Sequence, residues 1–295
     1  MSGIIVGLDI GGTGTRAVAW SDGFQPAEAI GGAGNPAGIG LDAARRNLSG
    51  VLAELVDGAS VDALCAGAAG ADGAWANEQL TTLLSELVPG ARVRVVNDGH
   101  LPLAAAGLSA GVVLIAGTGS IAYGRAGSGE EARAGGWGHL LGDEGSGYGT
   151  VKETIRSMLL ARDEARPLSR VHRALLEATG CEDPLDLLHR FHEHKEPDRW
   201  AAFSGVVFEA AEADPEAARV IEGGAAELAA SAQRVRDRLD PALPVVLAGG
   251  LLLGQPVLEA AVRRRLGGTV VRLEARPVDG ALRLARELAG AGWEG

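Results

Sequence analysis

Short apolar runs alternate along the first half of the chain with segments of helical spacing. Strands are predicted at residues 4–10, 16–20, 26–32, 61–70 and 92–98. Between them, apolar residues recur three and four positions apart at 41–56 and 77–88, which predicts helices. This alternation of strands and helices predicts an α/β fold.

The order of predicted elements begins again at residue 111. GVVLIAGTGSIAYGRA places a buried strand, a turn and a second strand as VGLDIGGTGTRAVAW does, which pairs the turn at 12–15 with the turn at 117–120. Further strands are predicted at 244–250 and 269–273, and further helices near 146–162, 169–179, 184–194, 198–213, 215–239, 257–266 and 278–290. We therefore expect a duplicated domain, with limits 1–108 and 109–295 and a closing helix that could pack back on the first half.

Composition narrows the class of protein. The 295 residues include no run near the roughly 18 apolar residues of a membrane span, and the first residues lack the features of a signal peptide. A net charge of -11 argues against nucleic acid or an anionic membrane as partner. Cys65 and Cys181 are isolated, so a disulfide framework is not expected. We expect a cytoplasmic protein.

The two turns rich in Gly and Thr are candidate phosphate sites. Their successive backbone N–H groups and hydroxyls can surround a phosphate oxygen without a basic side chain. Neither is a Walker A loop or a dinucleotide fingerprint, because GxxxxGK[ST] does not follow and neither turn opens a helix. A single turn of this kind is more often only a tight hairpin. Two matching turns in matching halves favour one ligand clamped between the domains.

Two carboxylates stand where predicted strands end. Asp9 could hold a hydrated Mg²⁺ that bridges phosphates, or it could hydrogen-bond the adjacent turn. Asp98 could accept the proton of a hydroxyl that attacks a γ-phosphate, or it could belong to an Asn-Asp-Gly turn. The glycines of AGGL, at 248–251, would let a flat ring or a ribose approach the backbone.

The segment GGWGHLLGDEGSGYG, at 135–149, holds seven glycines and has no apolar periodicity. It is either a mobile loop with a core Trp or a wall that approaches a ligand through its backbone. Ser146 is expected to begin the helix that follows. His189, His192 and His194 lie close together, but structural zinc closes four ligands, so a solvated helix end is the better interpretation.

Together these motifs resemble the sugar kinases of the actin-like, hexokinase-like ATPase superfamily, in particular the N-acetylglucosamine kinases and the BadF/BadG/BcrA/BcrD ATPases. The resemblance covers nearly the whole chain. GLDIGGTGTR and LIAGTGS are similar to the two phosphate motifs, VVNDG to the catalytic-aspartate strand and VVLAGG to the adenosine motif, while GGWGHLLGDEGSGYG is the most specific. The resemblance implies duplicated actin-like, ribonuclease H-like domains with a cleft between them.

The resemblance also implies a reaction, namely phosphorylation of the 6-hydroxyl of an amino sugar such as N-acetylglucosamine by ATP. Asp98 would be the catalytic base and Asp9 would organise Mg²⁺. The implied substrate-binding residues are Asn35, Asp98, Ser120, Ile121, Gly136, Trp137, Gly138 and Asp143. The implied ATP-binding residues are Gly11, Gly12, Thr13, Gly117, Thr118, Gly119, Ala202, Gly249, Gly250 and Gly254.

Departures from the family pattern leave alternatives open. Ile10 replaces a frequent glycine, and Ile121 stands where some relatives carry a polar residue beside the sugar, so glucosamine or another hexose stays an alternative acceptor. The two cysteines match neither the iron–sulfur arrangement nor the zinc motif of related branches. An ATPase switch and a non-catalytic sugar sensor are the rival functions, and a homodimer is possible because relatives are often dimers.

Overall fold

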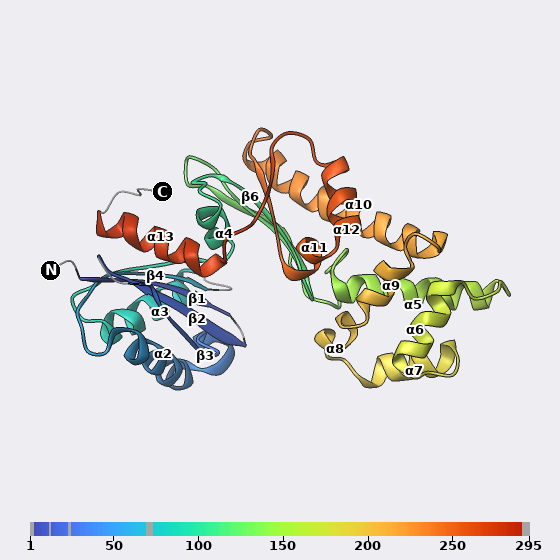
Figure 1. The fold of residues 1–295 in the computed structure, drawn as a ribbon, viewed down its shortest axis with the longest axis horizontal. Coiled ribbons are helices and arrows are strands. Elements are labelled where there is room, and N and C mark those ends of the chain that lie inside the picture. The colour runs from blue at the N-terminus through green and yellow to red at the C-terminus, as the bar shows by residue number, and fades with distance from the viewer. Residues whose placement is uncertain (1–2, 12, 23–24, 69–72, 291–295) are drawn as a thin grey trace. The chain divides into compact units, whose positions relative to one another are not determined.

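The computed structural model describes residues 3–11, 13–22, 25–68 and 73–290. By packing, the described residues up to Ala110 and from Leu273 onward form one compact unit, and Gly111–Arg272 form a second. Each unit contains a five-stranded mixed sheet flanked by helices (Figure 1). The domain limits expected from the sequence stay a prediction.

The sheet of the first unit has the order β3-β2-β1-β4-β5. Its strands are β1 (Ile4–Ile10), β2 (Gly14–Trp20), β3 (Ala27–Gly32), β4 (Val61–Ala68) and β5 (Arg92–Asn97). The first three strands pair antiparallel, whereas β1, β4 and β5 are parallel, with Asp9 opposite Gly67 and Ala68 opposite Asn97. Parallel strands in this register end at the same edge of the sheet, which brings the ends of β1 and β5 to one side.

Helices cover both faces of this sheet. On one face, α2 (Leu41–Val56) and α3 (Ala74–Leu87) contribute to a core around the even-numbered side chains of β1. On the other face, α4 (His100–Ala105) and α13 (Pro277–Ala289) pack against β1 and β4 (Figure 1). Glycine permits this close approach, because a Cβ on Gly7 would collide with the backbone of Leu282. The short helix α1 (Pro36–Ile39) precedes α2.

The second unit repeats the topology of the first. Its sheet, read from one edge, has the order β8-β7-β6-β9-β10. The strands are β6 (Gly111–Ala116), β7 (Ser120–Arg125), β8 (Glu131–Gly135), β9 (Val245–Ala248) and β10 (Val270–Arg272). Again the first three strands are antiparallel and β6, β9 and β10 are parallel. The duplication predicted from the two glycine-rich turns is thereby confirmed.

Helices make up much of the second unit. They are α5 (Gly147–Asp163), α6 (Arg170–Thr179), α7 (Pro184–Glu193), α8 (Pro197–Ala201), α9 (Ser204–Ala210), α10 (Pro215–Leu239), α11 (Gly250–Gly254) and α12 (Pro256–Arg265). α10 packs along β6, β7 and β8, while α6, α7 and α8 lie away from the sheet (Figure 1). The single helix predicted at 198–213 was wrong, because the chain turns after α8 and so brings the rings of Trp200 and Phe203 to 6.0 Å in one aromatic cluster.

Within the described residues, no helix combines the length and the apolar character that crossing a bilayer requires.

Candidate functional site

Asp9 and Asp98 lie close enough in the first unit for their charges to interact. Asp9 is half-buried near the end of β1, and Asp98 directly follows β5. Burial raises the pKa of the Asp9 carboxyl and the Asp98 carboxylate raises it further, while Arg16 on the neighbouring β2 lowers it. Two adjacent carboxylates that repel each other are a place where a cation would be stabilising.

The backbone around Asp98 is fixed on both sides. Its N–H donates to the carbonyl of Ala68 at 3.3 Å, which ties it to the end of β4. Its carbonyl accepts from the N–H of Leu101 at 3.1 Å, in the first turn of α4. Strand β4 and helix α4 therefore hold the backbone of the predicted catalytic base in a defined position.

The first turn, between β1 and β2, is closed by a hydrogen bond from Gly11 N–H to Gly14 carbonyl at 2.8 Å. Thr13 is exposed in this turn, as a phosphate ligand must be, whereas Gly12 lies outside the described residues. Asn35 is the N-cap of α1, where its Oδ1 accepts from the N–H of Ala37 at 3.0 Å. Its predicted contact with the sugar stays a prediction.

The second turn, between β6 and β7, rests on the start of α5. Gly117 N–H donates to Gly119 carbonyl at 2.9 Å, which closes the turn. The N–H groups of Gly147 and Tyr148 donate to the carbonyls of Gly117 and Thr118, at 2.8 and 3.3 Å. The first residues of α5 thus hold this turn, and Thr118 remains exposed.

Asp143 supports the second turn directly, a role that its place in the sequence did not predict. Its Oδ1 accepts from the N–H of Ser120 at 3.0 Å, and the Ser120 hydroxyl donates to the carbonyl of Glu144 at 2.9 Å. Only 9% of Asp143 is exposed, and a Cβ on Gly119 would lie 2.9 Å from its Oδ1. The predicted contact of Asp143 with sugar hydroxyls stays a prediction.

The loop after β8 brings several predicted acceptor residues together. Gly136 N–H donates to Ser120 carbonyl at 3.0 Å, and a Cβ on Gly136 would lie 2.7 Å from the side chain of Ile121. Trp137 is 59% exposed, with the Arg133 guanidinium 5.0 Å from its ring centroid. Gly138, which has φ 78°, accepts from the N–H of Leu141. Ser120, Ile121, Gly136 and Asp143 thus form one contiguous group, beside which Trp137 offers an open ring.

The predicted adenosine positions lie at the ends of two helices of the second unit, α8 and α11. Gly249 has φ 95°, caps α11, and approaches Ala116 so closely that a Cβ would collide with its backbone. A Cβ on Gly250 or Gly254 would meet only open space. Ala202 is the C-cap of α8, next to Ala201, whose Cβ lies 3.1 Å from where a Cβ on Gly147 would be. Their contacts with the nucleotide stay a prediction.

The donors for a metal are few. In the part of the chain that the structure describes, no group of three or more His, Cys, Asp or Glu side chains could hold a metal ion. Mg²⁺ usually binds through one or two carboxylates and completes its shell with water and phosphate oxygens. Asp9, with Asp98 beside it, fits that requirement. Cys65 and Cys181 are buried and unbonded to each other, and burial raises the pKa of the Cys65 thiol to about 12.

The chain is similar in sequence to two named kinases. The chain is 37% identical over 146 residues to the N-acetylmuramic acid/N-acetylglucosamine kinase of Clostridium acetobutylicum, a match that spans 49% of this chain and 44% of that relative. It is 29% identical over 239 residues to the N-acetyl-D-glucosamine kinase of Dictyostelium discoideum, which covers 74% of each protein.

A solved structure from Chromobacterium violaceum, provisionally named an N-acetylglucosamine kinase, is 26% identical. It matches with a TM-score of 0.74 over 96% of this chain and 99% of that one. Residues 6–285 also match the profile of the BadF/BadG/BcrA/BcrD ATPase family, from β1 to α13. The chain therefore belongs to the BadF/BadG/BcrA/BcrD ATPase family.

Proposed function

We propose that this protein is an ATP-dependent sugar kinase that transfers a phosphoryl group to the 6-hydroxyl of N-acetylglucosamine. The observation that carries the proposal is the pairing of Asp98 with Asp9 at one edge of the first sheet, where the two carboxylates interact electrostatically. The names of the Clostridium and Dictyostelium relatives support the choice of acceptor.

In this proposal Asp98 acts as the catalytic base. Phosphoryl transfer depends mainly on positioning and on electrostatic stabilisation, because the protein contributes little covalent chemistry. A fixed carboxylate beside the acceptor hydroxyl orients the attacking oxygen and takes its proton as the bond to phosphorus forms. The hydrogen bonds that tie Asp98 to Ala68 and Leu101 support this role, since they fix the backbone from which the carboxylate projects.

Magnesium belongs to the same proposal. Asp9 would hold the ion, while the triphosphate and water would supply its remaining ligands. When bound, Mg²⁺ neutralises part of the charge that develops on the phosphate oxygens. The raised pKa of Asp9 supports the assignment, because burial and, after it, the neighbouring Asp98 carboxylate disfavour the ionised form of Asp9 until a cation compensates its charge.

The turns at Thr13 and Thr118 would bind the phosphates of ATP through backbone N–H groups and hydroxyls. The group formed by Ser120, Ile121, Gly136 and Asp143, together with Asn35, Trp137 and Gly138, would bind the sugar. Ile121 adds an apolar surface to this group, which suits a methyl or a ring face better than a further hydroxyl. ATP is supplied in the cytoplasm, so that compartment is part of the proposal. A homodimer stays a prediction.

The test is ATP consumption measured across a panel of sugars. The panel contains N-acetylglucosamine, glucosamine, glucose and, because of the Clostridium relative's name, N-acetylmuramic acid. Turnover that requires an amino sugar, with phosphate found on its 6-oxygen by NMR, supports the kinase. Turnover that is independent of sugar would instead indicate an ATPase switch, and the absence of turnover with saturable sugar binding would indicate a sensor.

A further inference from the structure

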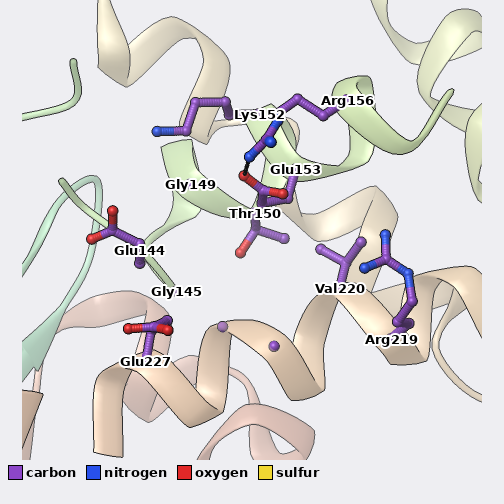
Figure 2. A pocket seen from close by; sticks show the side chains of 12 residues that line it. Glu144, Gly145, Gly149, Thr150, Lys152, Glu153, Arg156, Arg219, Val220 and Glu227 are labelled. Atoms are coloured by element: carbon purple, nitrogen blue, oxygen red, sulfur yellow. Dashed lines mark hydrogen bonds and ion pairs between the residues drawn. The ribbon is translucent and has the colours of Figure 1, made fainter. Parts of the chain in front are cut away.

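A pocket of about 440 Å³ lies in the second unit between α5 and α10 (Figure 2). Its volume is within the range of small-molecule sites. The residues that line it include none of those assigned above to ATP, to Mg²⁺ or to the sugar. The pocket is therefore available for a ligand that the proposed reaction does not explain.

Two adjacent glycines, Gly223 and Gly224, interrupt the middle of α10 where it lines this pocket. Glycine inside a helix costs about 1 kcal/mol relative to alanine, so each position calls for a reason. Gly224 has one, because a Cβ there would lie 2.9 Å from the Cα of Gly145. A Cβ on Gly223 would meet only open space. We infer that glycine at position 223 keeps the pocket open, because any side chain there would project into it.

The α5 side of the pocket carries two cations, Lys152 and Arg156, and one carboxylate, Glu153. Of its cations, Arg156 is paired with Glu153 at 2.7 Å. Lys152 has no carboxylate at ion-pair distance among the residues that the structure describes, and its Nζ lies 3.5 Å from the carbonyl of His139. The ammonium group of Lys152 can therefore take an anionic group from a ligand, with Arg156 on the same helix adding positive potential.

Glutamates stand on another side of the pocket. Figure 2 shows Glu144 and Glu227 away from the arginines, with Arg219 across from them. Arg219 is already paired with Glu216 at 2.6 Å, and Glu227 has only a loose contact of 3.8 Å with Arg234. Glu144 has no ion-pair partner in the described parts of the chain. This side can therefore accept a cationic group from a ligand.

The remaining lining is polar or lacks a side chain. Val220 is the one apolar side chain beyond glycine among the described lining residues, and the Thr150 hydroxyl lies near the middle of the view (Figure 2). Such a surface offers hydrogen bonds to hydroxyls and little to a nucleobase or an acyl chain. A polar ligand of monosaccharide size fits it best.

We propose that this pocket binds an amino sugar phosphate with a free ammonium group. Its phosphate lies toward Lys152 and Arg156, and its ammonium group lies toward Glu144 and Glu227. The space kept open by Gly223 holds the ring. The proposal goes beyond the kinase activity and is tested separately, because binding is measured without ATP and no lining residue is among those assigned above to ATP, to Mg²⁺ or to the sugar.

The test is isothermal titration calorimetry of the full chain with glucosamine 6-phosphate. Glucose 6-phosphate lacks the ammonium group and glucosamine lacks the phosphate, so each removes one half of the proposed recognition. We expect saturable binding of glucosamine 6-phosphate and affinities at least about tenfold lower for both analogues. Equal affinity for glucose 6-phosphate, or no saturable binding at all, would overturn the proposal.

Gly223→Met locates the site, because the new side chain enters the pocket while methionine favours the helix. Gly50→Met is the matched control, since Gly50 is also a helical glycine whose Cβ would meet open space, in α2 of the first unit. We expect at least about tenfold weaker binding to Gly223→Met and unchanged binding to Gly50→Met. Binding that survives in Gly223→Met lies elsewhere, for example at the acceptor site, and refutes the assignment.

Glu227→Gln is a second variant that leaves the pocket's shape intact. It is expected to weaken the binding of glucosamine 6-phosphate while leaving that of glucose 6-phosphate unchanged. An equal effect on both ligands would contradict the assigned orientation. Phosphorylation of N-acetylglucosamine by each variant is measured in parallel, so that loss of the kinase site is recognised separately from loss of this pocket.

Discussion

The Asp143 carboxylate accepts a hydrogen bond from the backbone N–H of Ser120, 3.0 Å away, across 23 positions of sequence. The Ser120 hydroxyl in turn donates to the carbonyl of Glu144, so the two segments hold each other. Asp143 adopts φ 63°, a left-handed conformation that Asp and Asn tolerate better than most residues. The acceptor loop and the second phosphate turn are therefore one structural unit.

Two variants, Asp143→Asn and Asp143→Ala, separate the structural role of Asp143, which supports Ser120, from its proposed role in binding the sugar. Asparagine retains an acceptor oxygen and the left-handed conformation, so we expect near-normal stability and KM for ATP, with a raised KM for the sugar. Alanine loses a charged hydrogen bond and is strained at this φ, so we expect about 2–4 kcal/mol less unfolding free energy. Urea unfolding and steady-state kinetics measure both. Equal stability of the two variants would show that the contact with Ser120 is unimportant.

Asp98→Asn tests the base. The amide has the shape of the carboxylate but cannot take a proton, so we expect kcat to fall by roughly 10² to 10⁴ while the KM for ATP changes little. Asp42→Asn, an exposed position in the first turn of α2, is the matched control and should leave kcat unchanged. A decrease in kcat of less than about tenfold for Asp98→Asn would assign the base elsewhere.

The sequence predicted the strands well where they are continuous apolar runs. Residues 111–116 are such a run and residues 4–10 are one that only Asp9 interrupts, and the matching turns after them revealed the duplication that the two sheets confirm. Strand β8 was missed, because EARAG buries only Ala132 fully and shows no apolar run. Helix α4 was missed as well, since it has six residues and carries Pro102.

The sequence predicted which residue types form the candidate site better than it predicted how those residues are arranged. The sequence indicated Asp9 and Asp98 as strand-end carboxylates, and the parallel register of β1, β4 and β5 places them at one edge. It could not indicate that Asp143 supports Ser120, because that contact depends on the tertiary course of the loop. A polar residue between glycines, as in GDEG, was the available signal of an unusual backbone.

Asp9 gives the stability a defined dependence on pH. Folding raises the pKa of its carboxyl, so the folded chain holds that proton more tightly than the unfolded chain. This proton therefore stabilises the folded state at pH values below the ordinary pKa of Asp. The stabilisation is lost as the pH rises through the raised pKa that Asp9 has in the folded state. We expect Asp9→Asn to be more stable than the parent at pH 7 without Mg²⁺, with a difference that disappears in acid. Unfolding by urea at several pH values measures this, and a difference independent of pH would contradict it.

With Mg²⁺ and ATP present at neutral pH, we expect the parent protein to be more stable than Asp9→Asn. The ion binds the ionised carboxylate, so it should raise the melting temperature of the parent in the presence of ATP and leave Asp9→Asn nearly unchanged. Ca²⁺ and Na⁺ at matched ionic strength are the controls. An equal rise for both proteins would place the ion away from Asp9.

His172 produces the opposite dependence on pH in the second unit. It is 2% exposed; its Nδ1 accepts from Ser169 N–H at 3.3 Å, and its Nε2 lies 2.8 Å from the Ser157 hydroxyl. The pKa of His172 is lowered, chiefly by burial and also by Arg166 and Arg173, although Glu216 and Asp214 act to raise it. A second proton on Nδ1 would face the Ser169 N–H. The contribution of neutral His172 to the free energy of unfolding is therefore complete above about pH 6.5, the ordinary pKa of histidine. It is lost as the pH falls through the lowered pKa that His172 has in the folded state.

We expect the urea midpoint to fall between pH 7 and pH 5 by a larger amount in the parent than in His172→Gln, which cannot titrate. His192→Gln, at an exposed position of α7, should keep the dependence of the parent. Identical profiles for the parent and His172→Gln would show that this histidine does not titrate with unfolding.

Thr15 carries a buried hydroxyl that gains no hydrogen bond within the described structure. Its side chain is 1% exposed, beside Gly34, and its Oγ1 has no partner there. A buried polar atom without a partner costs about 1–3 kcal/mol, and valine has nearly the same shape and suits a strand. We therefore expect Thr15→Val to raise the free energy of unfolding by about 1 kcal/mol.

Thr154→Val is the matched control, because that equally buried hydroxyl donates to the Thr150 carbonyl at 2.9 Å, and its loss should lower the free energy of unfolding. Urea unfolding of both variants measures the difference, and destabilisation by Thr15→Val would mean that the hydroxyl is satisfied in solution by bound water.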